Sequence, residues 1–129
     1  MKCLDAALDL LHNVVFKVFK MIGEFEYLLI TAAVRLGEDA YGAAIREEIA
    51  QTTGRSCSIG ALYTTVDRLQ SKGLLKTWKG EATPKRGGRA KRMVRVTPNG
   101  VRAATEFYEA VTRVSRGVSW AANRMRSTP

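Results

Sequence analysis

The stretch Ser56–Gly100 constrains the fold of this chain more than any other part. It begins with apolar residues at spacings of three and four, which places them on one face of a helix: Ile59, Leu62, Val66 and Leu69. Ser58 is a suitable N-cap for this helix, and Gly73 stands where it should stop. Two β-like runs follow, Leu74–Lys79 and Arg92–Thr97, separated by a loop rich in Gly, Lys and Arg. A helix followed by a hairpin with a basic tip is typical of a winged helix-turn-helix.

Two helical patterns precede this unit. Glu24–Leu36 has apolar residues at helical spacing and predicts a core helix, which Gly37 ends. Asp39 can cap the next helix, Tyr41–Gln51. A turn leads from that helix to the basic one, and together they have the order of a helix-turn-helix.

Helices that need a partner are expected at both ends of the chain. Residues 2–20 carry an apolar heptad stripe, and Thr97-Pro98 starts a second one that no proline interrupts until about Arg126. A helix of roughly 25 residues spans about 37 Å, more than a small domain needs for its own core. We therefore expect a dimer interface that includes Leu11, Val15, Val18, Phe107, Val111, Val114 and Val118.

The predicted fold is mainly α (α+β). It consists of an amphipathic helical extension (1–20), a winged helix-turn-helix (21–97) and a C-terminal dimerisation helix (98–129).

Positive charge is concentrated on the helix-plus-hairpin unit. The chain has 21 Lys and Arg against 12 Asp and Glu, a formal net charge of +9. Arg55–Thr97 holds 11 basic and two acidic residues, so this segment carries +9 and the rest of the chain sums to zero. A surface that faces a polyanion is charged in this way, and we expect double-stranded DNA as the partner.

Little in the sequence supports an enzyme, a metal site or a membrane protein. There is one His, with no Cys–His–acid grouping, no paired carboxylates and no phosphate loop. Cys3 and Cys57 lack metal-binding spacing, so we expect reduced thiols in a cytoplasmic protein. No apolar run is long enough to cross a membrane. We expect no cofactor and no metal.

Several fragments, taken in order, resemble the PadR family of bacterial transcriptional regulators. They are Tyr41–Ile45, Ile59–Thr65 with Asp67–Leu69, Lys72–Leu74, Gly87–Arg89 and Val96–Gly100, and the resemblance covers Ile22–Ala104. It implies a dimeric repressor with a winged helix and a C-terminal helix for dimerisation. A single C-terminal helix is similar to the short PadR subfamily. Some members release DNA on binding a small aromatic compound, which the resemblance extends to this chain as an expectation.

We expect the basic helix to enter the major groove and to offer DNA the residues off its core face or at its edge: Ser58, Ala61, Thr64, Thr65 and Arg68. Arg68 could instead pair with Asp67 or a neighbouring acid. Tyr63 resembles the family's tyrosine at this position and is expected to hydrogen-bond a phosphate, with packing against the wing as the alternative. Tyr41 starts a helix whose N–H groups can face a phosphate. The wing tip should follow the DNA backbone or enter a minor groove through Lys85, Arg86 and Arg89.

The two tryptophans and the operator complete the expectations. Trp78 is explained most simply by packing within the hairpin, and Trp120 by packing at the dimer interface, with a site for a flat aromatic ligand as the alternative. A two-fold dimer predicts a palindromic operator. Two other function classes stay open: a nonspecific or architectural nucleic-acid-binding module, and a protein-interaction module built on the same scaffold. The concentrated charge argues against the second of these.

Overall fold

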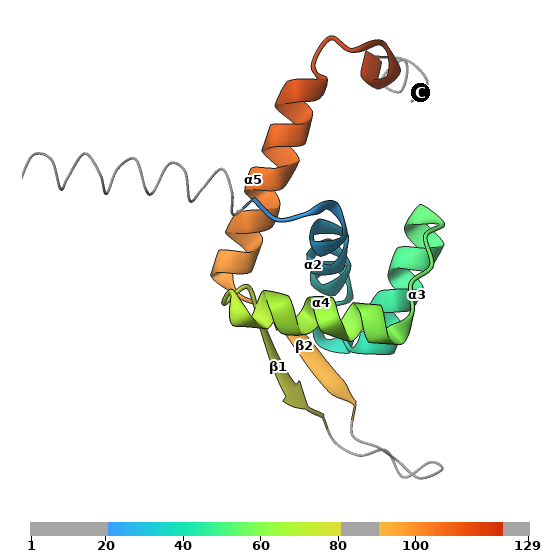
Figure 1. Cartoon of the computed structure of the whole chain (residues 1–129), viewed down its shortest axis with the longest axis vertical. Coiled ribbons are helices and arrows are strands. Elements are labelled where there is room, and N and C mark those ends of the chain that lie inside the picture. The colour runs from blue at the N-terminus through green and yellow to red at the C-terminus, as the bar shows by residue number, and fades with distance from the viewer. Residues whose placement is uncertain (1–20, 81–90, 123–129) are drawn as a thin grey trace, which may run out of the picture.

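A computed structural model describes residues 21–80 and 91–122 of the chain. In chain order the elements are α2 (Glu24–Leu36), the 3₁₀ turn η1 (Gly37–Asp39), α3 (Gly42–Thr53), α4 (Ile59–Ser71), β1 (Leu75–Lys79), β2 (Arg92–Val96) and α5 (Pro98–Ser115) (Figure 1). The two strands form a small antiparallel sheet, and helices make up most of the remainder. The expected mainly α, winged helix-turn-helix fold is confirmed.

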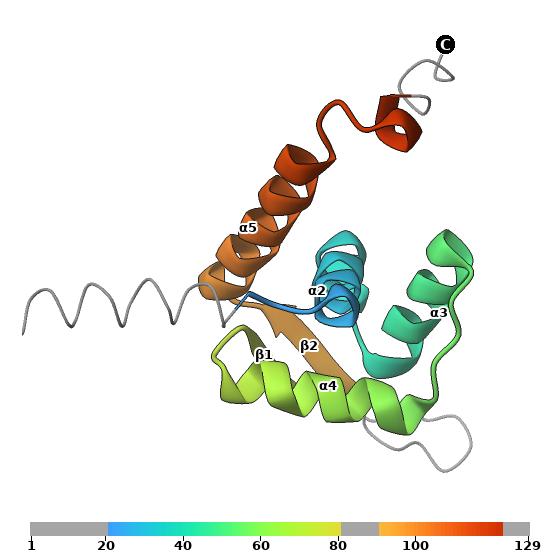
Figure 2. The same cartoon turned by 45° about the horizontal axis from the view of Figure 1, so that its top comes forward.

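The core lies where α2, α3, α4 and the two strands meet. Figure 2 shows α2 between α5 and α3, with α4 running beneath them. Each element contributes side chains that are almost fully buried: Leu29 and Ile30, Ile45 and Ile49, Leu62, Val66 and Leu69, Leu75, and Val94. The apolar stripes of α2, α3 and α4 therefore face the same core, and this arrangement leaves the outer face of α4 free.

Local capping explains where α4 begins and ends. The Ser58 hydroxyl accepts a hydrogen bond from the Ala61 N–H at 3.1 Å, which satisfies one free donor of the first turn. Gly73 follows the helix with a φ of +76°, a left-handed conformation that suits glycine. In the turn before the helix, the Arg46 guanidinium donates to the carbonyl of Cys57 at 2.6 Å. The expected start and stop of this helix are both confirmed.

The wing is held to the start of α3 as well as to α4. Leu75 pairs with Val96 and Lys79 with Arg92, so the strands are in register along their whole length. The Val94 N–H donates to the carbonyl of Ala40 at 2.9 Å, and Tyr41 forms an isolated bridge with Met93. These backbone bonds fix the direction of the hairpin relative to the helix-turn-helix.

The last helix is shorter than the apolar pattern predicts. Thr97 caps α5 by accepting from the Gly100 N–H at 3.1 Å, as expected, but the helix ends at Ser115. Gly117 has a φ of +78°, which breaks the helix before a new helical segment that includes Ser119–Ala122. The prediction of one continuous helix to about Arg126 is wrong, and Val118 does not share a helix with Val111.

Two further expectations, on Asp39 and Ile59, are wrong, and the predicted interface residue Phe107 has a contact within the subunit. Asp39 does not cap α3: its N-cap is Tyr41, whose side chain makes no capping bond. Ile59 is 41% exposed although the spacing placed it on the core face, because it sits at the first position of α4, beyond the edge of the core. Phe107 stacks on Tyr27 within the subunit, with ring centroids 4.9 Å apart, so this side chain is committed to the packing of α5 on α2.

Several predicted site residues lie outside the described part of the chain: Leu11, Val15, Val18, Lys85, Arg86 and Arg89. Within residues 21–80 and 91–122, no helix is both long and apolar enough to cross a bilayer.

Candidate nucleic-acid interface

The exposed side of α4 begins at its first turn. Ser58, Ala61, Thr64 and Arg68 are all exposed, in agreement with the expectation that they lie off the core face. Thr65 is not: it is 8% exposed, and its hydroxyl donates to the carbonyl of Ala61 at 3.0 Å. The expectation that Thr65 is available to DNA is therefore wrong, because its position on α4 turns toward the core beside Val66.

Tyr63 lies between the start of α3 and the wing. Its hydroxyl is so close to Gly42, the first residue of α3, that a Cβ there would overlap the tyrosine ring. The guanidinium carbon of Arg92, on β2, lies 5.6 Å from the centre of the same ring. Packing against a wing residue, the alternative expectation, is therefore present, and the hydroxyl still lies at the N-terminus of a helix, where anions are stabilised.

A positive charge lies against Tyr41, which is also at the start of α3. The Lys91 ammonium lies 4.2 Å from the centre of the Tyr41 ring, within the range of a cation–π contact. Tyr41 is itself the N-cap of α3. A lysine, the N–H groups of a helix start and the Tyr63 hydroxyl thus lie around one point of the surface, a combination suited to a phosphate oxygen.

A side-chain network joins α4 to both strands of the wing. Arg92 on β2 donates to the Asp67 carboxylate at 2.6 Å and to the Gln70 side-chain oxygen at 3.2 Å, while Thr77 on β1 donates to Gln70 at 2.8 Å. Asp67 is the one acidic residue of α4, and its pairing partner is Arg92 rather than the adjacent Arg68. The network holds the wing against the helix and neutralises the carboxylate on its exposed face.

Arg92 was not identified as a site residue from the sequence, because it entered there only as one of the 11 basic residues of Arg55–Thr97. The one available signal was Asp67, one of only two acids within the strongly basic segment Arg55–Thr97, since such an acid needs a nearby cation.

Not every basic residue of the charged segment is free to meet DNA. Arg55 pairs with Glu24, and the Lys72 ammonium lies 3.1 Å from the buried Glu26 carboxylate. Arg95 covers Trp78 at 5.6 Å, which agrees with packing of Trp78 within the hairpin although its side chain remains 45% exposed. Among the described side chains, Arg68, Lys76 and Lys79 form no ion pair, so their charges remain available to a polyanion.

In the part of the chain that the structure covers, no three His, Cys, Asp or Glu side chains lie close enough to bind an ion.

A short helix-turn-helix with a hairpin packed beside its second helix defines the class of winged-helix DNA-binding proteins. Residues 31–106 match the model of the transcriptional regulator PadR-like family, and the chain belongs to this family. The protein is therefore a transcriptional regulator and not an enzyme.

Solved structures agree with this assignment. The chain is similar to a PadR-like transcriptional regulator from Bacillus cereus (TM-score 0.59, 18% identity, covering 81% of this chain and 93% of that one). It is also similar to the PcaV transcriptional regulator from Streptomyces coelicolor in complex with its natural ligand (TM-score 0.59, 18% identity, covering 88% of this chain and 73% of that one). A third similar structure is F93 from STIV, a winged-helix DNA-binding protein (TM-score 0.50, 24% identity, covering 72% of this chain and 89% of that one). At these identities the likeness concerns the fold. The sequence matches no curated protein.

Proposed function

We propose that this protein is a repressor that binds a palindromic operator as a homodimer, with α4 in the major groove and the β1–β2 wing along the DNA backbone. The observation that carries the proposal is the charge of the chain: the whole net charge of +9 belongs to Arg55–Thr97, the segment that forms α4 and the hairpin. The exposed charges of Arg68 on α4 and of Lys76 and Lys79 on β1 support contact with DNA phosphates.

The phosphate contacts that we propose use Tyr41, Tyr63 and the wing-tip residues Lys85, Arg86 and Arg89. The first two lie at the N-terminus of α3, beside the Lys91 ammonium. Ser58, Ala61, Thr64 and Arg68 then face the groove. The wing-tip residues are proposed from the sequence alone.

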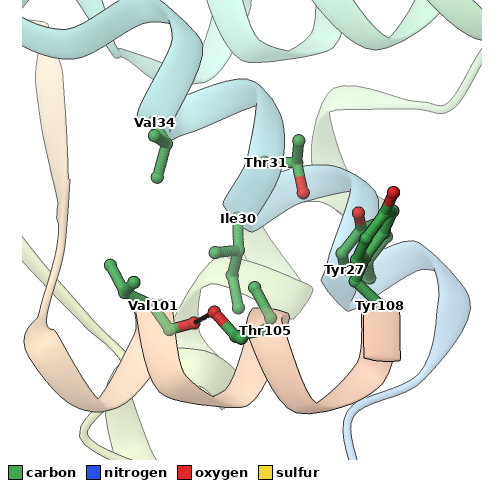
Figure 3. Close-up of a pocket in the computed structure, with 8 residues that line it drawn as sticks. Tyr27, Ile30, Thr31, Val34, Val101, Thr105 and Tyr108 are labelled. Carbon is green, nitrogen blue, oxygen red and sulfur yellow. Dashed lines mark hydrogen bonds between the residues drawn. The ribbon is translucent and has the colours of Figure 1, made fainter. Parts of the chain in front are cut away.

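Exposed apolar side chains on α5 support the dimer. Tyr108, Val111 and Val114 are 60%, 46% and 77% exposed, an unfavourable arrangement for a helix in water. A hollow of about 280 Å³ lies between α5 and α2, and its lining is almost entirely apolar. Figure 3 shows Ile30 and Val34 of α2 on one side and Val101 and Tyr108 of α5 on the other. A second copy of the chain would bury this surface.

The segment after α5 supports an aromatic effector. Trp120 is 71% exposed, and a cavity of about 560 Å³ lies in the bend between the end of α5 and Ala121-Ala122. That volume is within the range of small-molecule sites. The similar PcaV regulator is described in complex with its natural ligand. We propose that a flat aromatic compound binds near this bend and weakens DNA binding.

The test is a titration of the purified protein against the DNA upstream of its own gene and against a shuffled duplex, each at two salt concentrations. We expect tight binding to the upstream DNA alone, falling with salt by a slope of about −0.9 per phosphate contacted. Equal affinity for both duplexes would overturn the proposal of sequence-specific operator binding. The alternative, a nonspecific nucleic-acid-binding module, would then remain. Absence of binding to either would contradict the proposal as a whole.

A further inference from the structure

Ile59 is the exception among the apolar residues of α4. It is 41% exposed, whereas Leu62, Val66 and Leu69 on the same helix are fully buried. A β-branched residue loses side-chain freedom in a helix, and here only part of the side chain is buried in return. The packing of the subunit therefore accounts for only part of the isoleucine side chain at this position.

The Ser58 and Thr64 hydroxyl groups each make one hydrogen bond to the backbone of α4. The Ser58 hydroxyl accepts from the Ala61 N–H at 3.1 Å, and the Thr64 hydroxyl donates to the carbonyl of Gly60 at 2.9 Å. Gly60 has no side chain. The first two turns of α4 expose side chains that carry methyl groups, those of Ile59, Ala61 and Thr64.

Methyl groups in the major groove have one apolar partner among the four bases, the 5-methyl group of thymine. The charges around the turn favour its approach to DNA, because Arg68 lies further along α4 and Arg92 neutralises the Asp67 carboxylate. The first turn of a recognition helix is also the part that lies nearest to the base edges.

We propose that Ile59 is a specificity-determining residue that packs on the 5-methyl group of a thymine in each half-site. This inference rests on the proposed function, in which α4 enters the major groove. It makes apolar contact, and not a hydrogen bond, the source of base selection at this position.

The experiment uses the full-length protein and a duplex selected by it from a random pool. Each thymine of the selected duplex is replaced in turn by deoxyuridine, which lacks only the 5-methyl group. For the wild-type protein we expect one thymine per half-site whose replacement weakens binding about fourfold, the effect of one buried methyl group. For Ile59→Ala we expect weaker binding to the selected duplex and no further loss at that thymine.

Ile59→Val is the matched control. It keeps a branched apolar side chain, so sensitivity to that deoxyuridine should be retained. Because Ile59 is exposed, both variants should fold, and thermal unfolding checks this.

Two results would overturn the inference alone: the same deoxyuridine profile for the wild-type protein and Ile59→Ala, or an equal loss of affinity of Ile59→Ala for selected and shuffled DNA. If the wild-type protein enriches no duplex from the pool, the proposed function fails and the inference fails with it.

Discussion

Gly100, in the first turn of α5, lies directly against the chain that connects α4 to the wing. A Cβ built at this position overlaps the carbonyl oxygen of Leu74 and lies too close to the side chain of Val96. The Leu74 carbonyl also accepts the Thr97 N–H at 3.1 Å, so it cannot move without loosening the start of α5. The absence of a side chain at Gly100 therefore sets how closely α5 approaches the winged helix.

Gly100→Ala should destabilise the protein by about 3 kcal/mol, the upper end of overpacking costs, because the new atom meets backbone. Gly60→Ala is the matched control. A Cβ at Gly60 meets no atom within 4 Å, so this substitution should stabilise α4 by about 0.5 kcal/mol through helix propensity. Chemical denaturation of both variants measures the difference. Similar stabilities for the two would show that α5 packs less tightly on Leu74 than the structure indicates.

Arg68 is exposed on α4 and makes no ion pair with any described residue. If it neutralises a phosphate, Arg68→Ala should lower affinity for all DNA sequences and reduce the salt slope by about 0.9 per half-site. Arg102→Ala removes the same charge from α5, away from the proposed interface, and should leave the slope close to that of the wild type. Titrations at several salt concentrations decide between these outcomes, and an equal change in both variants would remove Arg68 from the interface.

At the scale of elements, side chains join α4 to the wing, in addition to the backbone bonds that hold the wing to the start of α3. The Asp67–Arg92 contact at 2.6 Å and the Thr77–Gln70 bond at 2.8 Å cross from the helix to both strands. Both groups of the ion pair are partly exposed, so its contribution to stability should be small. Its main consequence is geometric, because it sets where the basic wing lies relative to the groove that α4 enters.

Asp67→Ala gives a test in which the sign of the change is informative. Loss of a negative charge from a DNA-binding face would by itself raise affinity. If Asp67 positions the wing through Arg92, affinity for the operator should instead fall, by about threefold or more, while stability changes by only about 0.5 kcal/mol. The double variant with Arg92→Ala should add little to either single change. A rise in the affinity of Asp67→Ala would show that the wing holds its position without this pair.

At the scale of the whole molecule, α5 has two parts that its apolar stripe does not distinguish. Phe107 packs on Tyr27 inside the subunit, whereas Val111 and Val114 remain exposed beyond the reach of α2. The Phe107–Tyr27 contact anchors α5 to the winged domain, whereas Val111 and Val114 lie on the part of α5 that extends away from it. The exposed end is the part available to a second copy.

Val114→Glu tests this division. In a monomer, a charge at a position that is 77% exposed should have little effect. In a dimer that buries Val114, the unpaired carboxylate should weaken association by about 100-fold or more. Arg102→Glu introduces a larger change of charge on the same helix and serves as the control. Sedimentation over a range of concentrations gives the result, and unchanged association of Val114→Glu would remove α5 from the interface.

Local patterns in the sequence were sufficient for the elements and for the capping of α4 and α5. Ser58 and Thr97 begin their helices as their residue types predict, since a cap depends on residues three positions apart. Glu24–Leu36 has the bounds that its periodicity predicts. The end of α5 was missed because apolar spacing continues through Gly117, whose left-handed conformation interrupts the helix without interrupting the pattern.

The sequence by itself determined the class of the protein and where its charge lies, because periodicity and net charge are properties of neighbouring residues. Only the tertiary structure decided how individual charges are used: Arg92 meets Asp67 across 25 positions, and Lys72 meets Glu26 across 46. In the folded chain Thr65 is buried and Ile59 is partly exposed, whereas the helical pattern placed Ile59 on the core face of α4 and Thr65 off that face or at its edge. Contacts between distant segments depend on how closely and at what angle the elements pack together. A local sequence pattern carries no information on that packing.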